Sequence, residues 1–132
     1  MQGSKKYLLL VEDNEIDAFI IKSIMKHETP QIDLITYRNG QEGLDFLNDI
    51  DGSTAPLLIL LDLNMPICNG FTFMEKYEEK LYKKYPIIPV YVLSSSFLPE
   101  DIVRCQKYPF IKDYLVKPIG AEVLRKLLVN LE

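Results

Sequence analysis

Short apolar runs alternate with longer amphipathic segments along the whole chain. The apolar runs are typical of strands and are, in chain order, Tyr7–Val11, Asp33–Tyr37, Leu57–Leu61, Ile87–Leu93 and Asp113–Val116. The third run is apolar at consecutive rather than alternate positions, which is the pattern of a strand that is covered on both faces, as in a parallel sheet. The pattern therefore predicts a sheet with helices on both sides.

The segments between these runs carry apolar residues at helical spacing. The first extends from about Glu15 to His27 and is predicted to bury a face made of Ile16, Phe19, Ile20 and Ile24. The other predicted helices are a segment after Asn39-Gly40 that carries Leu44 and Leu47, and the segments of about Gly70–Lys83, Pro99–Lys107 and Ala121–Leu131. Five strands that alternate with five helices predict an α/β fold with a doubly wound, five-stranded parallel sheet.

Polar side chains stand where four of the predicted strands end. Glu12 and Asp13 follow the first strand, and Asp62 follows the third. Ser94 follows the fourth strand and Lys117 the fifth. In such sheets, ligands bind outside the carboxyl ends of the strands, at the point where the strand order reverses. If the order is 2-1-3-4-5, the first and third strands are neighbours at that point, and three acidic side chains converge in one crevice.

Converging carboxylates predict a cation site. Two carboxylates about 4 Å apart repel each other by roughly 4 kcal/mol at an effective dielectric constant of 20, so a bound cation relieves the repulsion. Mg²⁺ fits best, because it takes oxygen ligands and is often held by one or two carboxylates together with water and a substrate phosphate. The sequence has no cluster of histidine and cysteine that would indicate zinc.

Composition narrows the class of protein further. The 132 residues suit one domain, and the formal net charge of −4 argues against a nucleic-acid partner. No apolar run approaches the roughly 18 residues that a membrane span requires, so we expect a cytoplasmic protein. Cys68 and Cys105 are interpreted as free thiols, with a redox role as the alternative.

Four blocks of the sequence together resemble the response-regulator receiver domain family, in its chemotaxis-regulator-like form. They are "LLLVEDNE" with Glu12 and Asp13, "LLDLNMPICNG" with Asp62, "PVYVLSSS" with Ser94 and "DYLVKP" with Lys117. Each block alone is weak evidence for the family, but the order and separations of all four are specific for it. The resemblance extends from about Lys6 to Leu131. It implies one receiver domain over residues 1–132, with a core of about 6–131 and no output domain.

The resemblance implies that this domain is the phosphoacceptor of a two-component or phosphorelay system. Asp62 would take the phosphoryl group from a partner histidine kinase or phosphotransfer protein and become an acyl phosphate. Asp13 and Asp62 would bind Mg²⁺ directly, and Glu12 would act mainly through bound water. The backbone carbonyl of Asn64 would supply one more oxygen.

The resemblance also implies which groups hold the transferred phosphoryl group. The Lys117 ammonium and the Ser94 hydroxyl would contact its oxygens, together with backbone N–H groups. The peptide bond between Lys117 and Pro118 would be cis, which is plausible only before proline.

By the same resemblance, phosphorylation changes the surface of the molecule. Ser94 would move toward the phosphoryl group, and Tyr114 would turn inward into the space that Ser94 leaves. The surface of the fourth and fifth strands and the adjoining helix would then bind an unknown downstream protein or support onward phosphotransfer, as a shift between two existing states. Asn64 and Ser96, which lie two residues after Asp62 and Ser94, would tune the lifetime of the phosphoryl group.

The segment before the fifth predicted strand departs from the family pattern. Pro109, Phe110 and Ile111 stand where small residues are usual in the family. We expect Pro109 to stop the preceding helix. We hypothesise that Phe110 and Ile111 form a distinctive surface for a partner or a homodimer, next to the fourth and fifth strands.

Two other classes of protein share parts of this pattern. A Mg²⁺-dependent phosphohydrolase with an aspartyl-phosphate intermediate typically needs a second acid two residues after its nucleophile, where this chain has Asn64. A nucleotide-binding flavodoxin-like protein usually needs glycines in the loop after the first strand, and "EDNEID" has none. The sequence therefore favours a receiver that phosphorylates and dephosphorylates itself over a turnover enzyme.

Overall fold

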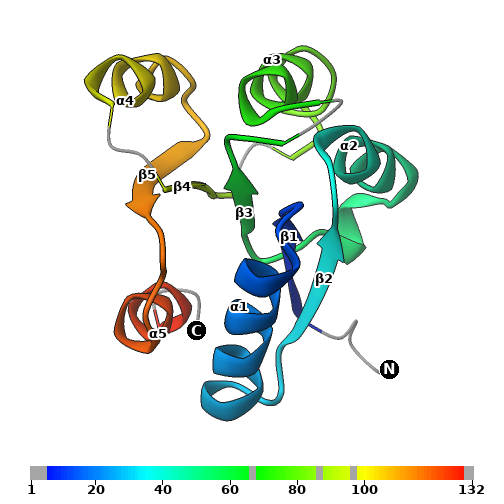
Figure 1. Cartoon of the computed structure of the whole chain (residues 1–132). Coiled ribbons are helices and arrows are strands. Elements are labelled where there is room, and N and C mark those ends of the chain that lie inside the picture. Colours follow the sequence, from blue (N-terminus) through cyan, green and yellow to red (C-terminus); the bar gives the residue numbers. More distant parts are fainter. Residues whose placement is uncertain (1–5, 66–67, 86–87, 96–97, 130–132) are drawn as a thin grey trace.

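A five-stranded parallel sheet in the order β2-β1-β3-β4-β5 forms the centre of the protein (Figure 1). The computed structural model describes residues 6–65, 68–85, 88–95 and 98–129. The strands are β1 (Tyr7–Val11), β2 (Asp33–Tyr37), β3 (Ile59–Asp62), β4 (Val90–Ser94) and β5 (Ile111–Val116). Each neighbouring pair is parallel. The predicted fold class and strand order are confirmed.

Helices cover both faces of this sheet. They are α1 (Glu15–Glu28), α2 (Gly40–Asp49), α3 (Gly70–Lys80), α4 (Pro99–Gln106) and α5 (Ala121–Val129), with a short 3₁₀ helix at Gly52–Thr54. Figure 1 shows α1 and α5 on one face and α2, α3 and α4 on the other. Side chains alternate along a strand, so Leu8 and Leu10 of β1 pack in the core beneath α1 and α5, while Leu9 and Val11 pack in the core beneath α2, α3 and α4. This two-sided burial explains why the central strands β1 and β3 are apolar at consecutive positions.

Asparagine side chains begin the helices that follow β1, β2 and β3. The side chain of Asn14 accepts hydrogen bonds from the backbone N–H groups of Ile16 and Asp17 at the start of α1. Asn39 and Asn69 cap α2 and α3 in the same way. Each cap satisfies backbone donors that the helix leaves unpaired, which favours a helix that begins at that residue.

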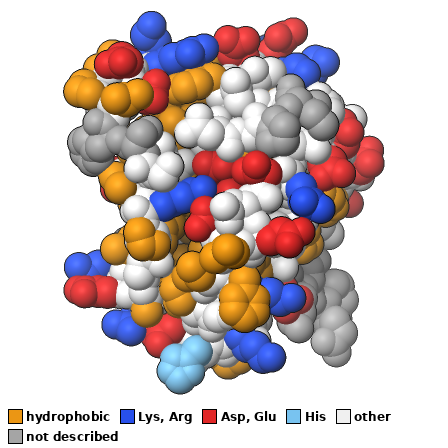
Figure 2. All heavy atoms as spheres, in the orientation of Figure 1, with side chains coloured by type: hydrophobic (Ala, Val, Ile, Leu, Met, Phe, Trp, Pro, Cys, Tyr) orange, Lys and Arg blue, Asp and Glu red, His pale blue; other side chains and the backbone are white. Residues whose placement is uncertain are grey.

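The buried face of α1 differs from the predicted one. Ile16 and Phe19 are 71 % and 67 % exposed, whereas Ile21 and Met25 are almost fully buried against the sheet. In Figure 2, hydrophobic side chains gather on this surface above the pale blue side chain of His27. Seven of the ten residues from Ile16 to Met25 are apolar. Helical spacing is therefore compatible with more than one buried stripe, and the pattern selected the wrong one.

The hypothesis that Phe110 and Ile111 form a partner surface is wrong. Phe110 is only 3 % exposed, and its ring centroid lies 4.7 Å from that of Tyr77 and 5.5 Å from those of Tyr82 and Tyr108. Ile111 begins β5 and packs, partly buried, against the same core. The large side chains fill space between α3, α4 and β5, so any homodimer through the face of β4 and β5 has to use other residues.

Most element boundaries lie within two or three residues of the predicted ones. The predicted third strand began at Leu57, but β3 begins at Ile59, and β5 begins earlier than predicted, at Ile111. Ile87 and Leu131, predicted as the ends of two elements, lie outside the described residues. Cys68 and Cys105 are free and buried, as expected for unpaired thiols. Within the described part of the chain, the helices are all too short or too polar to span a bilayer.

Candidate functional site

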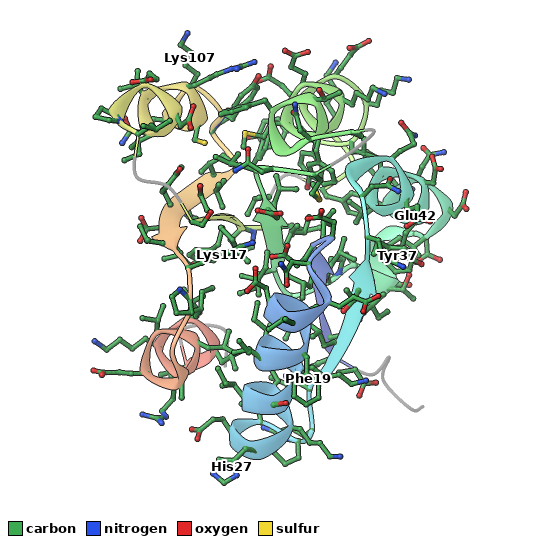
Figure 3. The ribbon with its side chains drawn as sticks, in the orientation of Figure 1. Phe19, His27, Tyr37, Glu42, Lys107 and Lys117 are labelled. Carbon is green, nitrogen blue, oxygen red and sulfur yellow. The ribbon has the colours of Figure 1, made fainter. Side chains whose placement is uncertain are left out.

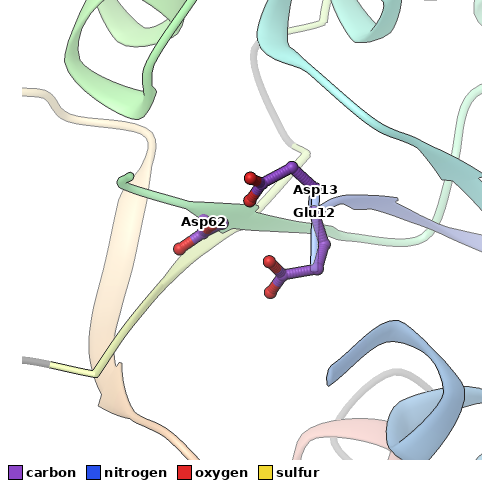
Figure 4. Close-up of side chains that lie close together, drawn as sticks. All are labelled: Glu12, Asp13 and Asp62. Carbon is purple, nitrogen blue, oxygen red and sulfur yellow. The ribbon is translucent and has the colours of Figure 1, made fainter. Parts of the chain in front are cut away.

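Three carboxylates meet at the carboxyl ends of β1 and β3 (Figure 4). Glu12 and Asp13 directly follow β1, and Asp62 is the last residue of β3. The two strands are neighbours in the sheet, which brings their ends side by side. One oxygen from each residue lies within 4.8 Å of one oxygen from each of the others. The predicted convergence of the three acids is therefore observed.

Two of these acids are buried. Glu12 is 1 % and Asp62 is 3 % exposed, while Asp13 is partly exposed. The backbone N–H of Asn14 donates to Glu12 Oε2 at 3.2 Å, and the backbone N–H of Asn64 lies 3.4 Å from Asp62 Oδ1. Buried carboxylates of like charge are costly unless positive charge compensates for them. The site therefore favours cations.

Lys117 supplies one positive charge from the end of β5 (Figure 3). Its ammonium nitrogen lies 2.7 Å from Glu12 Oε1 and 3.2 Å from Asp62 Oδ1. The backbone N–H of Lys117 donates to the carbonyl oxygen of Ser94 at 2.8 Å, which fixes the position of the residue beside β4. The peptide bond to Pro118 is cis, as the sequence resemblance implied.

The same ammonium group has a third neighbour that sequence reasoning missed. Asp17, in the first turn of α1, places Oδ2 3.0 Å from Lys117 Nζ. Asp17 lies four residues after Asp13 and belongs to none of the blocks that carry the family resemblance. Its spacing alone could not distinguish a side chain that faces the site from one that faces solvent.

The charges in this cluster shift the pKa of both Asp62 and Lys117. Burial and the charge of Glu12 raise the pKa of Asp62 to about 7, although Lys117 opposes the rise. Burial alone would lower the pKa of Lys117, but its hydrogen bonds to Glu12 and Asp17 and the charge of Asp62 hold that pKa above its usual value. Lys117 is therefore charged at neutral pH. A cation that binds Asp62 favours the ionised carboxylate and lowers its pKa.

The structure describes three of the four remaining predicted residues. Ser94 is the last residue of β4 and is fully buried. Tyr114 lies in β5 opposite Val92 and is partly buried. Asn64 is exposed, and its backbone carbonyl as a metal ligand stays a prediction. Ser96 lies outside the described residues.

This arrangement is suited to phosphoryl chemistry on a carboxylate. The three acids offer only oxygen atoms, which are the ligands that Mg²⁺ and Mn²⁺ prefer, and together they could hold one such ion. Asp62 lies close both to the acids at the end of β1 and to the Lys117 ammonium, which also contacts Glu12. A nucleophilic oxygen flanked by positive charges is what transfer of a phosphoryl group requires.

The chain is similar to known receiver proteins over nearly its whole length. The family model described as "Response regulator receiver domain" matches residues 8–129. Response regulator Rcp1 from Synechocystis sp. is 31 % identical over 130 residues, which cover 96 % of this chain and 86 % of that protein.

Solved structures agree with this similarity. A two-component response regulator from Legionella pneumophila superposes with a TM-score of 0.84 at 26 % identity, over 96 % of this chain and 98 % of that one. The Mn(2+)-bound form of response regulator Rcp1 superposes with a TM-score of 0.74 at 29 % identity, over 96 % and 91 % of the two chains.

Proposed function

The chain belongs to the response regulator receiver domain family, and from that premise we propose that Asp62 is its phosphoacceptor. Receiver domains are signalling modules that interact with histidine kinases or phosphotransfer proteins. The observation that carries the proposal is the position of the Asp62 carboxylate, which is buried at a strand end close to Glu12 and to the Lys117 ammonium. Such a carboxylate is placed for reaction with an anionic group rather than for contact with water.

The proposed reaction moves one phosphoryl group between two proteins. An oxygen of the Asp62 carboxylate attacks the phosphorus of a phosphohistidine on the partner. The phosphorus–nitrogen bond breaks, its electron pair returns to the imidazole nitrogen, and an acyl phosphate forms on Asp62. The groups around Asp62 need not form covalent bonds themselves, because positioning and charge neutralisation dominate phosphoryl transfer. Lys117 offers its ammonium group 3.2 Å from Asp62 Oδ1, and Ser94 offers a hydroxyl group at the end of the neighbouring strand.

Glu12, Asp13 and Asp62 would hold a divalent cation, and we propose Mg²⁺. The fit rests on the donor set, in which three carboxylate oxygens lie within 4.8 Å of one another and two of the three residues are buried. A bound Mg²⁺ supplies positive charge that neutralises the attacking carboxylate and the phosphoryl oxygens. The Mn(2+)-bound structure of the similar protein Rcp1 supports a site for a divalent cation. The Asn64 carbonyl is proposed as one further ligand.

We propose a binding output rather than catalytic turnover. The phosphoryl group adds nearly two negative charges and three strong acceptor oxygens, which would draw Ser94 toward it and let Tyr114 turn inward. The surface of β4, β5 and the adjoining helix would then bind a downstream protein or pass the phosphoryl group onward. A phosphohydrolase is not favoured, because the position two after Asp62 is Asn64, where such enzymes need a second acid.

Labelling by a small phosphodonor tests the assignment of Asp62. With phosphoramidate and Mg²⁺, we expect the wild-type protein to take up one phosphoryl group and Asp62→Asn to take up none. Asp49→Asn is the matched control, because it makes the same change at an exposed residue at the end of α2, and it should be labelled like the wild type. Full labelling of Asp62→Asn would refute the assignment.

A further inference from the structure

The Lys117 ammonium is shared by three carboxylates, and only two of them belong to the cation site. Its nitrogen lies 2.7 Å from Glu12 Oε1, 3.0 Å from Asp17 Oδ2 and 3.2 Å from Asp62 Oδ1. An ammonium group has three N–H donors. Of the three contacts, the one with Asp17 has the geometry of a hydrogen bond, whereas those with Glu12 and Asp62 are ion pairs.

Asp17 differs from the other two carboxylates because it is not also a candidate cation ligand. Glu12 and Asp62 also belong to the group that could hold a divalent cation, together with Asp13. Carboxylate charge that is engaged by a cation is less available to a lysine, because the ion is the largest local charge. Asp17 is outside that group, so it stays available to Lys117 whether or not the cation is present.

The position of Asp17 is well fixed by the start of α1. Its backbone N–H donates to the side chain of Asn14 at 3.0 Å, as part of the helix cap. One turn later on the same side of the helix, Ile21 is buried against the sheet. The side chain of Asp17 is 29 % exposed and that of Lys117 only 13 %, so this ion pair is partly shielded from water. A carboxylate held in this way can orient a flexible lysine.

We propose that Asp17 is a positioning residue for Lys117. It holds the ammonium group beside Asp62. Its ion pair with Lys117 also weakens the interaction of the ammonium group with the carboxylates that would bind the cation. Among the described residues, the carboxylates that would remain beside the Lys117 nitrogen without Asp17 are those of Glu12 and Asp62, where the lysine competes with Mg²⁺. The inference rests on the proposed phosphorylation of Asp62, to which Asp17 contributes through Lys117.

Asp17→Ala is expected to change two measurable quantities. At saturating Mg²⁺, the rate of phosphorylation by phosphoramidate should fall about tenfold, which is typical when a group that orients a metal-site residue is removed. The Mg²⁺ dissociation constant, measured by calorimetric titration without a phosphodonor, should rise several-fold. Glu15→Gln is the control, because it removes the same charge from the same helix at a side chain that is 81 % exposed and paired with Arg38. Both quantities should stay within about twofold of the wild type there, since exposed charges are screened.

A double-mutant cycle separates positioning from a structural role. If Asp17 acts through Lys117, then Asp17→Ala should cost nothing further in a protein that already carries Lys117→Met, in phosphorylation rate or in Mg²⁺ affinity. Equal losses in both backgrounds, or wild-type values for Asp17→Ala, would overturn the inference. If Asp17→Ala does not fold, Asp17→Asn replaces it, with a smaller loss expected because its side-chain oxygen can still accept a hydrogen bond.

The outcome also distinguishes this inference from the proposed function. If the wild-type protein is not phosphorylated on Asp62, the proposed function fails, and the Mg²⁺ titrations still decide whether Asp17 controls Lys117. If the wild type is phosphorylated and Asp17→Ala behaves like it, the proposed function stands and the role of Asp17 is wrong.

Discussion

At the scale of single residues, Asp62 is a carboxyl group whose surroundings oppose its ionisation. Burial and the charge of Glu12 raise its pKa to about 7, and the ammonium of Lys117 only partly offsets them. The role of nucleophile that we propose for Asp62 requires the ionised carboxylate. The site therefore depends on additional positive charge, which is the physical reason to expect a divalent cation beside Lys117.

Asp62→Asn should stabilise the protein at alkaline pH when metal is removed with a chelator. Because the pKa of Asp62 is raised in the folded state, the folded protein binds the proton more tightly than the unfolded chain, and wild-type stability falls as the pH rises from about 4 to about 7. Asparagine does not ionise and escapes this loss. Lys117 stays charged throughout, since its pKa lies above the usual value.

Urea unfolding at pH 8 should therefore show Asp62→Asn more stable than the wild type by roughly 1–3 kcal/mol. The difference should shrink toward pH 4, where the wild-type carboxyl group is protonated in the folded state. A variant that is less stable than the wild type at pH 8 would mean that the Asp62–Lys117 contact outweighs the cost of burying the charge.

The strand-end residues were predictable from the sequence, whereas Asp17 was not. Glu12, Asp13 and Asp62 each follow an apolar run, and strand order alone brings their side chains together. The direction of Asp17 depends on the rotation of α1 about its own axis. That rotation is set by packing against the sheet and was assigned incorrectly from the pattern.

At the scale of elements, packing against the sheet determines which side of α1 is buried, because the periodicity of apolar residues allows more than one side. The helix has apolar residues on several sides, and the side that carries Ile21 and Met25 is the one that packs against the sheet. Strands are less ambiguous, because side chains alternate between two faces and both faces are buried in the central strands β1, β3 and β4. The same limit applies to Phe110. The sequence marked it as unusual, but whether it lies in the core or on the surface depends on the tyrosines of α3 and the following loops.

Ile16→Ala and Ile21→Ala make the same chemical change on the two sides of this helix. Ile21 is 4 % exposed, so its truncation should reduce the free energy of unfolding by about 2–4 kcal/mol. Ile16 is 71 % exposed, so its truncation should change that free energy by less than about 1 kcal/mol. Urea unfolding of both variants measures the difference. Similar losses at the two positions would contradict the orientation of α1 described above.

At the scale of the whole molecule, the fold gathers the ends of four strands at one edge of the sheet. The doubly wound topology places the ends of β1, β3, β4 and β5 along this edge. Lys117 directly follows β5 and lies 3.2 Å from Asp62 Oδ1, and Tyr114 is a residue of β5. This connection is the basis of the proposed switch.

Mg²⁺ should stabilise the folded wild-type protein, because the ligands come together only when the chain is folded. At a free Mg²⁺ concentration about 100 times the dissociation constant, the expected gain is about 2.7 kcal/mol. Asp13→Asn should lose most of this gain, while Asp49→Asn, at an exposed end of α2, should keep it. Thermal unfolding with and without Mg²⁺ provides the comparison. An equal gain for Asp13→Asn would remove Asp13 from the cation site.

Locating the phosphoryl group by peptide mapping is the most direct test of the whole account. The protein is treated with phosphoramidate and Mg²⁺, reduced with borohydride to convert an acyl phosphate into a stable alcohol, digested and sequenced by tandem mass spectrometry. The account predicts that the modified residue is Asp62, and that omitting Mg²⁺ abolishes the modification. Modification of any other residue, with Asp62 intact, would contradict it.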